Sequence, residues 1–206
     1  MRKEELYPLI EKVVPHQSVL VTDIPDIDLY VDQVTGFIEK KLAEQKRHPK
    51  DKLLTKTMIN NYAKAGILIP PRQKKYSRQH IETLLMLYNA KQILSINDIS
   101  LLFSILHKPG DKHSEENGAY PLIDLLYSLV QEINDEQAEQ LQEICEEKVD
   151  LIKEKTKNVE GETGELIEWF LLAMYLVSQA AAGKRLAEAI VDRYFKKDIP
   201  QKGKSS

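Results

Sequence analysis

Five residues in the sequence TKTMINNYAK have types and spacing that suit contact with nucleic acid. They share one face of a predicted helix, because their positions recur at intervals of three and four: Lys56, Thr57, Asn60, Asn61 and Lys64. A lysine ammonium pairs with phosphate oxygens, and an asparagine amide can form two hydrogen bonds with the major-groove edge of adenine. This helix face therefore predicts phosphate contact and base recognition from a single element.

A second group of cations follows in the sequence ILIPPRQKKY. Proline has no amide hydrogen, so a helix cannot continue across the Pro-Pro pair. Residues 67–76 are instead predicted to form a very short hairpin or extended turn, which we call the wing. The wing carries Arg72, Lys74 and Lys75, and we expect these cations to contact the flanking phosphates or the minor groove.

Charge is distributed unevenly along a chain whose net charge is -3. Residues 40–78 hold twelve Lys and Arg against two acids, a local balance of +10, and the remaining 17 bases and 30 acids give −13. Separation of this kind indicates one part that faces a polyanion and another part that does not. The alternative, in which the basic residues merely solvate a helix face, stays open at this point.

Hydrophobic spacing predicts the helices that position these residues. An amphipathic helix over 26–45 directs five apolar residues to one side: Ile27, Val31, Val34, Ile38 and Leu42. Thr55 is the predicted N-cap of the next helix, which ends at Gly66, a residue that adopts the left-handed conformation without strain. Two further helices are predicted to start after Ser77 and Ser95.

The second half of the chain is predicted to be a separate helical bundle. The polar sequence KPGDKHSEENG at 108–118 has no hydrophobic period and marks the domain boundary. Helices at 121–133, 135–157 and 163–195 follow, with Asn134 as the cap of the second. The predicted organisation is a terminal helix with a linker, a basic domain, a bundle and a flexible tail, at 1–25, 26–107, 119–195 and 196–206.

The order of helix, helix, Gly, apolar pair, Pro, Arg, basic residues, Tyr-Ser and helix resembles the DNA-binding domain of the MerR family of transcription regulators. In the sequence NNYAKAGILIPPRQKKYSRQHI the matching positions are Tyr62, Gly66, Ile67, Leu68, Pro70, Arg72, Lys74 and Tyr76. The resemblance covers roughly residues 26–106. It implies an all-α fold in which a winged helix-turn-helix domain with a short wing precedes a helical bundle.

The chain departs from the MerR pattern in several places, and no long, single, heptad-patterned dimerisation helix and no Cys-based metal-sensing site are expected in it. Asn60 and Asn61 stand where that family has Arg and Tyr, the link between the first two helices is longer, and the wing is shorter. Most of the chain, including IPDIDLYVDQVTGFIEKKL and LLTKTMINNYAKAGILIPP, also resembles a domain-of-unknown-function family of Gram-positive bacteria. This second resemblance implies no particular biochemistry.

No residue pattern predicts an enzyme, a metal site or a bound cofactor. The five histidines show no H-x-x-x-H spacing, and the sequence has no glycine-rich phosphate loop. The single cysteine, Cys145, excludes an intramolecular disulfide and fits a reducing cytosol. Its neighbours Glu143, Glu146 and Glu147 are expected to raise the pKa of the thiol, which is unfavourable for a nucleophile.

The most apolar segment, LIEWFLLAMYLVSQAAAG from Leu166, is expected to be a buried or interfacial helix that is too short for a bilayer. Its apolar residues surround the helix, so a second subunit is expected to cover what the shorter helices leave exposed. We therefore expect a cytoplasmic homodimer, formed through the C-terminal helices and without membrane contact, because helix-turn-helix proteins commonly bind paired half-sites.

These features predict a sequence-specific transcription regulator that binds double-stranded DNA. The alternative is a protein–protein adaptor on a winged-helix scaffold, whose basic face docks an acidic partner instead of DNA. No pattern in the sequence identifies a small-molecule effector.

Overall fold

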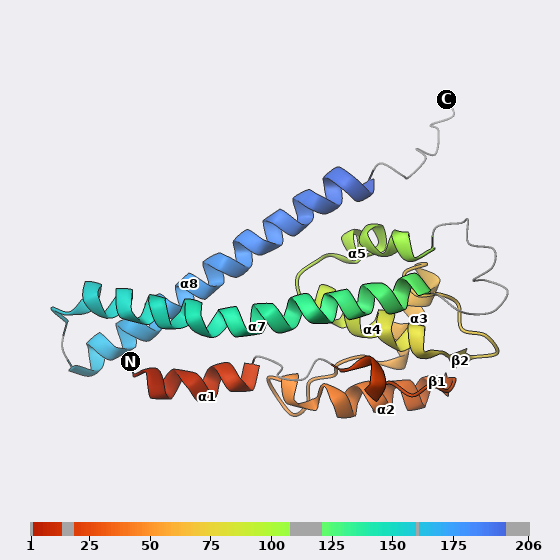
Figure 1. The fold of residues 1–206 in the computed structure, drawn as a ribbon, viewed down its shortest axis with the longest axis horizontal. Helices are drawn as coiled ribbons and strands as arrows, with labels where there is room; N and C mark the ends of the chain where they lie inside the picture. Colours follow the sequence, from red (N-terminus) through yellow and green to blue (C-terminus); the bar gives the residue numbers. More distant parts are fainter. Residues whose placement is uncertain (1, 14–18, 108–120, 160, 197–206) are drawn as a thin grey trace.

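The chain is mostly helical, with one small two-stranded sheet (Figure 1). The computed structural model describes residues 2–13, 19–107, 121–159 and 161–196. It confirms the expected predominance of helix. The predicted domain boundary at 108–118 lies outside the described residues, and so does the predicted tail apart from Lys196.

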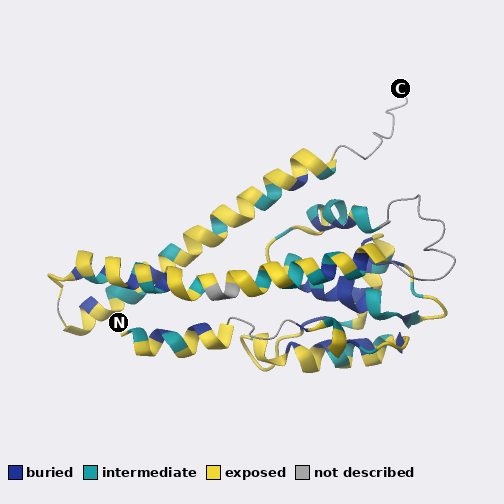
Figure 2. Cartoon of the chain, in the orientation of Figure 1, coloured by how far each residue is buried: buried dark blue, intermediate teal, exposed yellow. Residues whose placement is uncertain are grey.

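One hydrophobic core holds the N-terminal elements together. These elements are β1 (Leu29–Tyr30), α2 (Val31–Lys41), α3 (Lys56–Lys64), β2 (Lys75–Tyr76), α4 (Arg78–Ala90) and α5 (Ile96–Leu102). Short 3-10 helices lie at Val21–Asp23, Ala43–Gln45 and Phe103–His107. Val34, Ile38, Ile59 and Leu84 are fully buried, as their helical spacing predicts (Figure 2).

The helix predicted over 26–45 begins later and ends earlier. Residues 29 and 30 are extended as β1, and α2 starts where the Tyr30 N–H donates to Gln33 Oε1 (2.9 Å). Ile27 was expected on the core side, but 68% of it is exposed. Pairing with β2 gives Leu29 and Tyr30 backbone hydrogen bonds in an extended form, so tertiary pairing overrides the helical spacing.

Residues 121–156 form one continuous helix, α7 (Pro121–Thr156), in place of the two predicted helices. Asn134 lies inside α7, so its predicted role as a cap is wrong. Ile123 and Tyr127 are buried beside the N-terminal elements, and the Tyr127 hydroxyl donates to the Val19 carbonyl (2.5 Å). The later turns of α7 are buried in a different core. Packing at both ends of the helix therefore outweighs the preference of asparagine for a cap position.

A second, smaller core joins the two ends of the chain. Its side chains come from α1 (Lys3–Val13), α7 and α8 (Gly161–Ile190): Leu6, Ile10, Cys145, Val149, Ile152 and Leu172. Burial raises the pKa of the Cys145 thiol. The predicted direction of this pKa shift is thus confirmed, but its cause is loss of hydration and not the neighbouring carboxylates.

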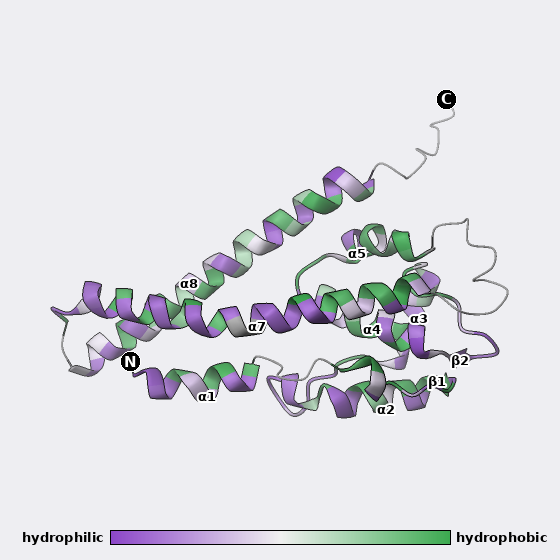
Figure 3. Ribbon diagram, in the orientation of Figure 1, coloured by the Kyte–Doolittle hydropathy of each residue, from purple (hydrophilic) through white to green (hydrophobic). Residues whose placement is uncertain are grey.

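Helix α8 is apolar along most of its length, yet most of its surface is exposed (Figures 2 and 3). Its buried residues are Gly164 and Leu172, and it continues as a π-helical turn at Val191–Phe195. By length and composition, the 35 residues of Gly161–Phe195 could cross a membrane, so the expectation that this segment is too short was wrong. Of its most apolar window, 6% is buried inside the protein.

Candidate nucleic-acid interface

A polar cap and two apolar side chains hold α3 in place. The Thr55 hydroxyl accepts a hydrogen bond from the Met58 N–H (3.2 Å), which confirms the predicted N-cap. Ile59 is fully buried and Tyr62 nearly so, and desolvation raises the pKa of the Tyr62 phenol. Because these side chains anchor one face of α3 in the core, the opposite face points to solvent.

The outward face of α3 consists of the residues that the sequence predicted. All five are exposed: Lys56, Thr57, Asn60, Asn61 and Lys64. Lys56 also forms an ion pair with Asp32 in the first turn of α2. This carboxylate offsets one cation at the start of α3, an effect that the spacing within α3 could not reveal.

Gly66 ends α3 and redirects the chain towards the wing. Its φ of +69° lies in the left-handed region, which confirms the predicted C-cap conformation. The Ile67 N–H then donates to the Tyr62 carbonyl (3.0 Å), which satisfies one of the open carbonyl groups at the helix end. Ile67, Leu68 and Ile69 are buried, so the base of the wing is anchored in the core.

The tip of the wing is a tight turn with a strained backbone. Gln73 and Lys74 have φ of +48° and +63°, and the Lys75 N–H donates to the Arg72 carbonyl (2.8 Å). Two successive positive φ values match a type I′ turn, which joins antiparallel segments through two residues. Arg72 and Lys74 are exposed at this turn, so two of the three predicted cations lie on the surface of the wing.

Replacing Lys74 with glycine should stabilise the fold, because glycine adopts a positive φ without the steric cost of about 1 kcal/mol that other residues incur. We expect the free energy of unfolding to rise by about 0.5–1 kcal/mol in a urea titration. Lys74→Ala removes the same charge but keeps the strain, and it should show no gain. Equal stability of the two variants would argue against strain at this position.

The strand that leaves the turn pairs with a segment that precedes α2. β1 and β2 are antiparallel, with Leu29 opposite Tyr76 and Tyr30 opposite Lys75. The Lys75 Nζ lies 5.7 Å from the centre of the Tyr30 ring, a distance that permits a cation–π interaction. Lys75 is half-buried and helps to hold the wing, although the sequence placed it only as a contact residue.

His80 supports the base of the wing from the first turn of α4. Its Nδ1 accepts a hydrogen bond from the Ser77 N–H (3.0 Å), and its ring meets the Tyr76 ring edge to face at 5.4 Å. Burial lowers the pKa of His80, while the nearby backbone of Pro70 and Ile69 acts in the opposite direction. The neutral imidazole therefore joins the wing to α4.

A cluster of one buried and two half-buried charged side chains, which the sequence did not reveal, joins α4 to α7. Arg78 Nη2 lies 2.9 Å from Asp124 Oδ1, and Arg78 Nε lies 3.4 Å from Glu82 Oε1. Glu82 is fully buried, and this burial, together with the nearby Asp124 carboxylate, raises its pKa to about 7. The i, i+4 spacing of Arg78 and Glu82 was the available signal, because Asp124 is distant in sequence.

Tertiary ion pairs reduce the positive charge of the basic segment. At least four of its twelve cations pair with carboxylates outside residues 40–78: Lys41 with Asp23, Lys46 with Glu39, Lys56 with Asp32, and Arg78 with Asp124. The balance of +10 counted along the sequence therefore overstates the charge that this segment presents to a ligand. Lys64, Arg72 and Lys74 remain exposed on α3 and the wing.

Comparison with protein families gives a match to DUF1836, described as a domain of unknown function, over residues 19–127. This match covers more than half of the chain, so the chain belongs to the DUF1836 family. Its limits coincide with a contact in the structure, because the side chain of Tyr127 is hydrogen-bonded to the carbonyl of Val19. No curated protein and no solved structure matches the chain.

The family match confirms the predicted resemblance to a domain of unknown function. It also includes the start of α7, which contacts α4 through the ion pair of Asp124 with Arg78 and contacts the segment before α2 through the hydrogen bond of Tyr127 to Val19. The predicted limits of the two domains stay a prediction, since the segment that would separate them lies outside the part of the chain described.

Proposed function

We propose that this protein is a cytoplasmic, sequence-specific DNA-binding transcription regulator. In this proposal α3 enters the major groove, and the wing contacts the adjacent backbone or minor groove. The observation that carries the proposal is the composition of α3, which is apolar on its buried side and presents two amides, a hydroxyl and two ammonium groups to solvent. The wing with its exposed Arg72 and Lys74 follows within ten residues of the end of the helix.

The dimensions of α3 suit this role. An α-helix with its side chains is about 10–12 Å in diameter and fits a major groove about 12 Å wide, and the nine residues of α3 span about 13 Å along its axis. Figure 1 shows α3, β1 and β2 at the same end of the molecule, away from the ends of α7 and α8 that are joined to each other. The five residues on the outward face of α3 are exposed, so they are accessible to a ligand.

The resemblance to MerR regulators also supports the proposal, through the order of α3, Gly66, the Pro-containing wing and α4. The departure at Asn60 and Asn61 changes what this helix would recognise. Two asparagine amides replace the Arg and Tyr side chains of the MerR pattern. As a result, α3 offers more hydrogen-bonding groups for base edges and fewer groups for phosphates.

One observation favours the alternative of a protein–protein adaptor. Asp32 lies beside Lys56, so a carboxylate would face the phosphate backbone near the start of α3. A protein surface mixes acidic, neutral and basic side chains, so it could place a neutral or basic group beside Asp32. The evenly charged phosphate backbone of DNA could not do so. Binding to random duplex DNA over a range of salt concentrations separates the two functions, because counterion release makes DNA binding weaken steeply with salt.

Replacing Asn60 or Asn61 with alanine should lower affinity for a selected DNA site by about 1–3 kcal/mol, because each amide can pair with a base edge. Binding to random duplex should barely change, since asparagine carries no charge. The site is obtained by selection from a random DNA pool, and affinities are measured by fluorescence anisotropy.

Lys64→Ala is the matched control on the same helix face. It should weaken binding to both DNAs and reduce the slope of log affinity against log salt by roughly one unit. If the asparagine variants equal the parent protein on the selected sequence, or if no sequence can be selected, α3 does not read bases and the adaptor function becomes the better explanation.

A further inference from the structure

One face of α8 carries a row of large apolar side chains. Leu166, Phe170, Met174 and Val177 are 69%, 62%, 46% and 58% exposed, and Ala181 continues the row at helical spacing. We call these five residues the α8 stripe. Single exposed apolar residues are ordinary on a protein surface, whereas a continuous row of this length marks a contact surface.

The α8 stripe points away from the helix that α8 packs against. Leu172 is buried against Cys145 and Val149 of α7, and Glu168 accepts a hydrogen bond from the Thr156 hydroxyl (3.1 Å). At 100° per residue, these two contacts lie on the side of α8 opposite the stripe. Within the described residues, α7 therefore covers the opposite face of α8 near Glu168 and Leu172 and leaves the four large side chains of the stripe exposed.

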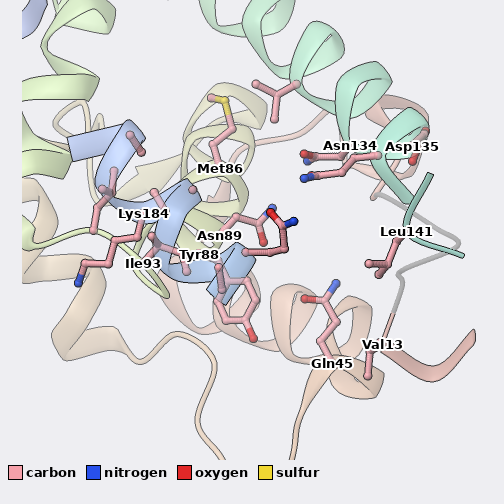
Figure 4. Close-up of a pocket in the computed structure, with 18 of the residues that line it drawn as sticks. Val13, Gln45, Met86, Tyr88, Asn89, Ile93, Asn134, Asp135, Leu141 and Lys184 are labelled. Carbon is pink, nitrogen blue, oxygen red and sulfur yellow. The ribbon is translucent and has the colours of Figure 1, made fainter. Parts of the chain in front are cut away.

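The C-terminal half of α8 has little cover on its other sides as well. An open cavity of about 1180 Å³ separates residues 175–187 from α4 and α7, and Met86, Asn89, Asn134 and Lys184 are among its lining residues (Figure 4). The C-terminal half of α8 is thus separated from α4 and α7 by this cavity and does not pack closely against them.

We propose that the α8 stripe packs against the same stripe of a second copy of this chain, with the two helices antiparallel. The stripe is symmetric about the point between residues 173 and 174. In an antiparallel pair centred there, Leu166 faces Ala181 of the second copy, Phe170 faces Val177, and Met174 lies near the axis. Large and small side chains then alternate across the contact, as close packing of two helices requires.

Charge at the two ends of the stripe selects the antiparallel direction. Glu162 lies one turn before Leu166, and Lys184 lies one turn after Ala181 on the same flank of the helix. The antiparallel pair brings Glu162 of each copy to Lys184 of the other, once at each end. A parallel pair would instead gather both Glu162 residues at one end and both Lys184 residues at the other, where they would find no opposite charge. This inference does not depend on DNA binding.

The contact is tested in solution without DNA by sedimentation equilibrium of the full chain. The parent protein should be a dimer, and Phe170→Glu should weaken the dimer by at least about 100-fold, because two carboxylates would be buried in the contact. Leu186→Glu is the matched control, since Leu186 is 64% exposed on a different face of α8. It should leave the dimer intact, and circular dichroism should show native helix content for both variants.

Direction is tested by exchanging charges. Glu162→Lys should weaken an antiparallel dimer, and the further change Lys184→Glu in the same chain should restore it. A parent protein that stays monomeric, a Phe170→Glu variant that stays dimeric, or a Glu162→Lys dimer as tight as the parent would overturn the proposal. So would a monomer that binds vesicles of phosphatidylglycerol and phosphatidylcholine through the stripe, because the occupant would then be lipid.

Discussion

A variant in which Arg72, Lys74 and Lys75 are all replaced by glutamate should lose binding to duplex DNA. Each phosphate contact releases about one counterion, so loss of three contacts should reduce the slope of log affinity against log salt by roughly three units. The new carboxylates also repel the phosphates. At low salt we expect affinity to fall on the order of 100-fold or more, measured by titration of labelled random duplex.

The fold should survive this triple change. Arg72 and Lys74 are exposed, and Lys75 loses a cation–π contact with Tyr30 that contributes about 0.5–1 kcal/mol at an exposed site. The control reverses three lysines at the far end of α7: Lys153, Lys155 and Lys157. The control makes the same change in net charge at the end of the molecule away from the wing, so it should keep most of the affinity. Unchanged binding by the wing variant, with a native thermal melt, would show that the wing is not the contact surface.

Replacing the buried Glu82 with glutamine should stabilise the protein by about 3 kcal/mol above pH 7. In the folded protein the pKa of Glu82 is raised from 4.5 to about 7, chiefly by burial and further by Asp124. Above pH 7 the folded state must therefore either hold a buried carboxylate or keep a proton that the unfolded chain would release to the solution. Glutamine has nearly the same shape, stays neutral and can donate to Asp124.

The benefit should depend on pH in a defined direction. Below pH 4.5 Glu82 is protonated in both the folded and the unfolded protein, so the two variants should be equally stable. As pH rises from 4.5 to about 7, the unfolded chain loses this proton first, and the stability of the parent protein falls relative to Glu82→Gln. The lowered pKa of His80 acts in the opposite direction, but it acts on both variants and cancels in their difference.

Urea titrations at about pH 5 and about pH 8 measure this difference. Glu143→Gln, an exposed change of the same kind on α7, is the control and should alter stability little at either pH. DNA affinity of Glu82→Gln should match that of the parent protein, because Glu82 lies inside the core and not on α3 or the wing. A difference in stability that does not change with pH would mean that Glu82 is ionised in the folded protein.

Local signals in the sequence determined the segments that form the candidate interface. Thr55 caps α3, Gly66 ends it with a positive φ, and Ser77 precedes α4, as predicted. Each of these features depends on contacts within a few residues, so composition and spacing are sufficient to find it. The outward face of α3 was predicted for the same reason, because residues four apart in a helix share one side.

Contacts between residues that are distant in sequence determined the features of the fold that these local signals did not predict. Tyr30 entered a strand because Lys75 was available to pair with it, and α7 stayed continuous through Asn134 because Tyr127 reached Val19 while Val149 reached the second core. The balance of charge at the interface likewise depends on carboxylates from other elements. A sequence shows which residues carry charge and which helical face they share, but an ion pair or a strand pair requires the partner segment to be placed in space. For this protein, the sequence predicted the exposed polar face of α3, and only the tertiary structure showed how much of the charge of the basic segment is already paired.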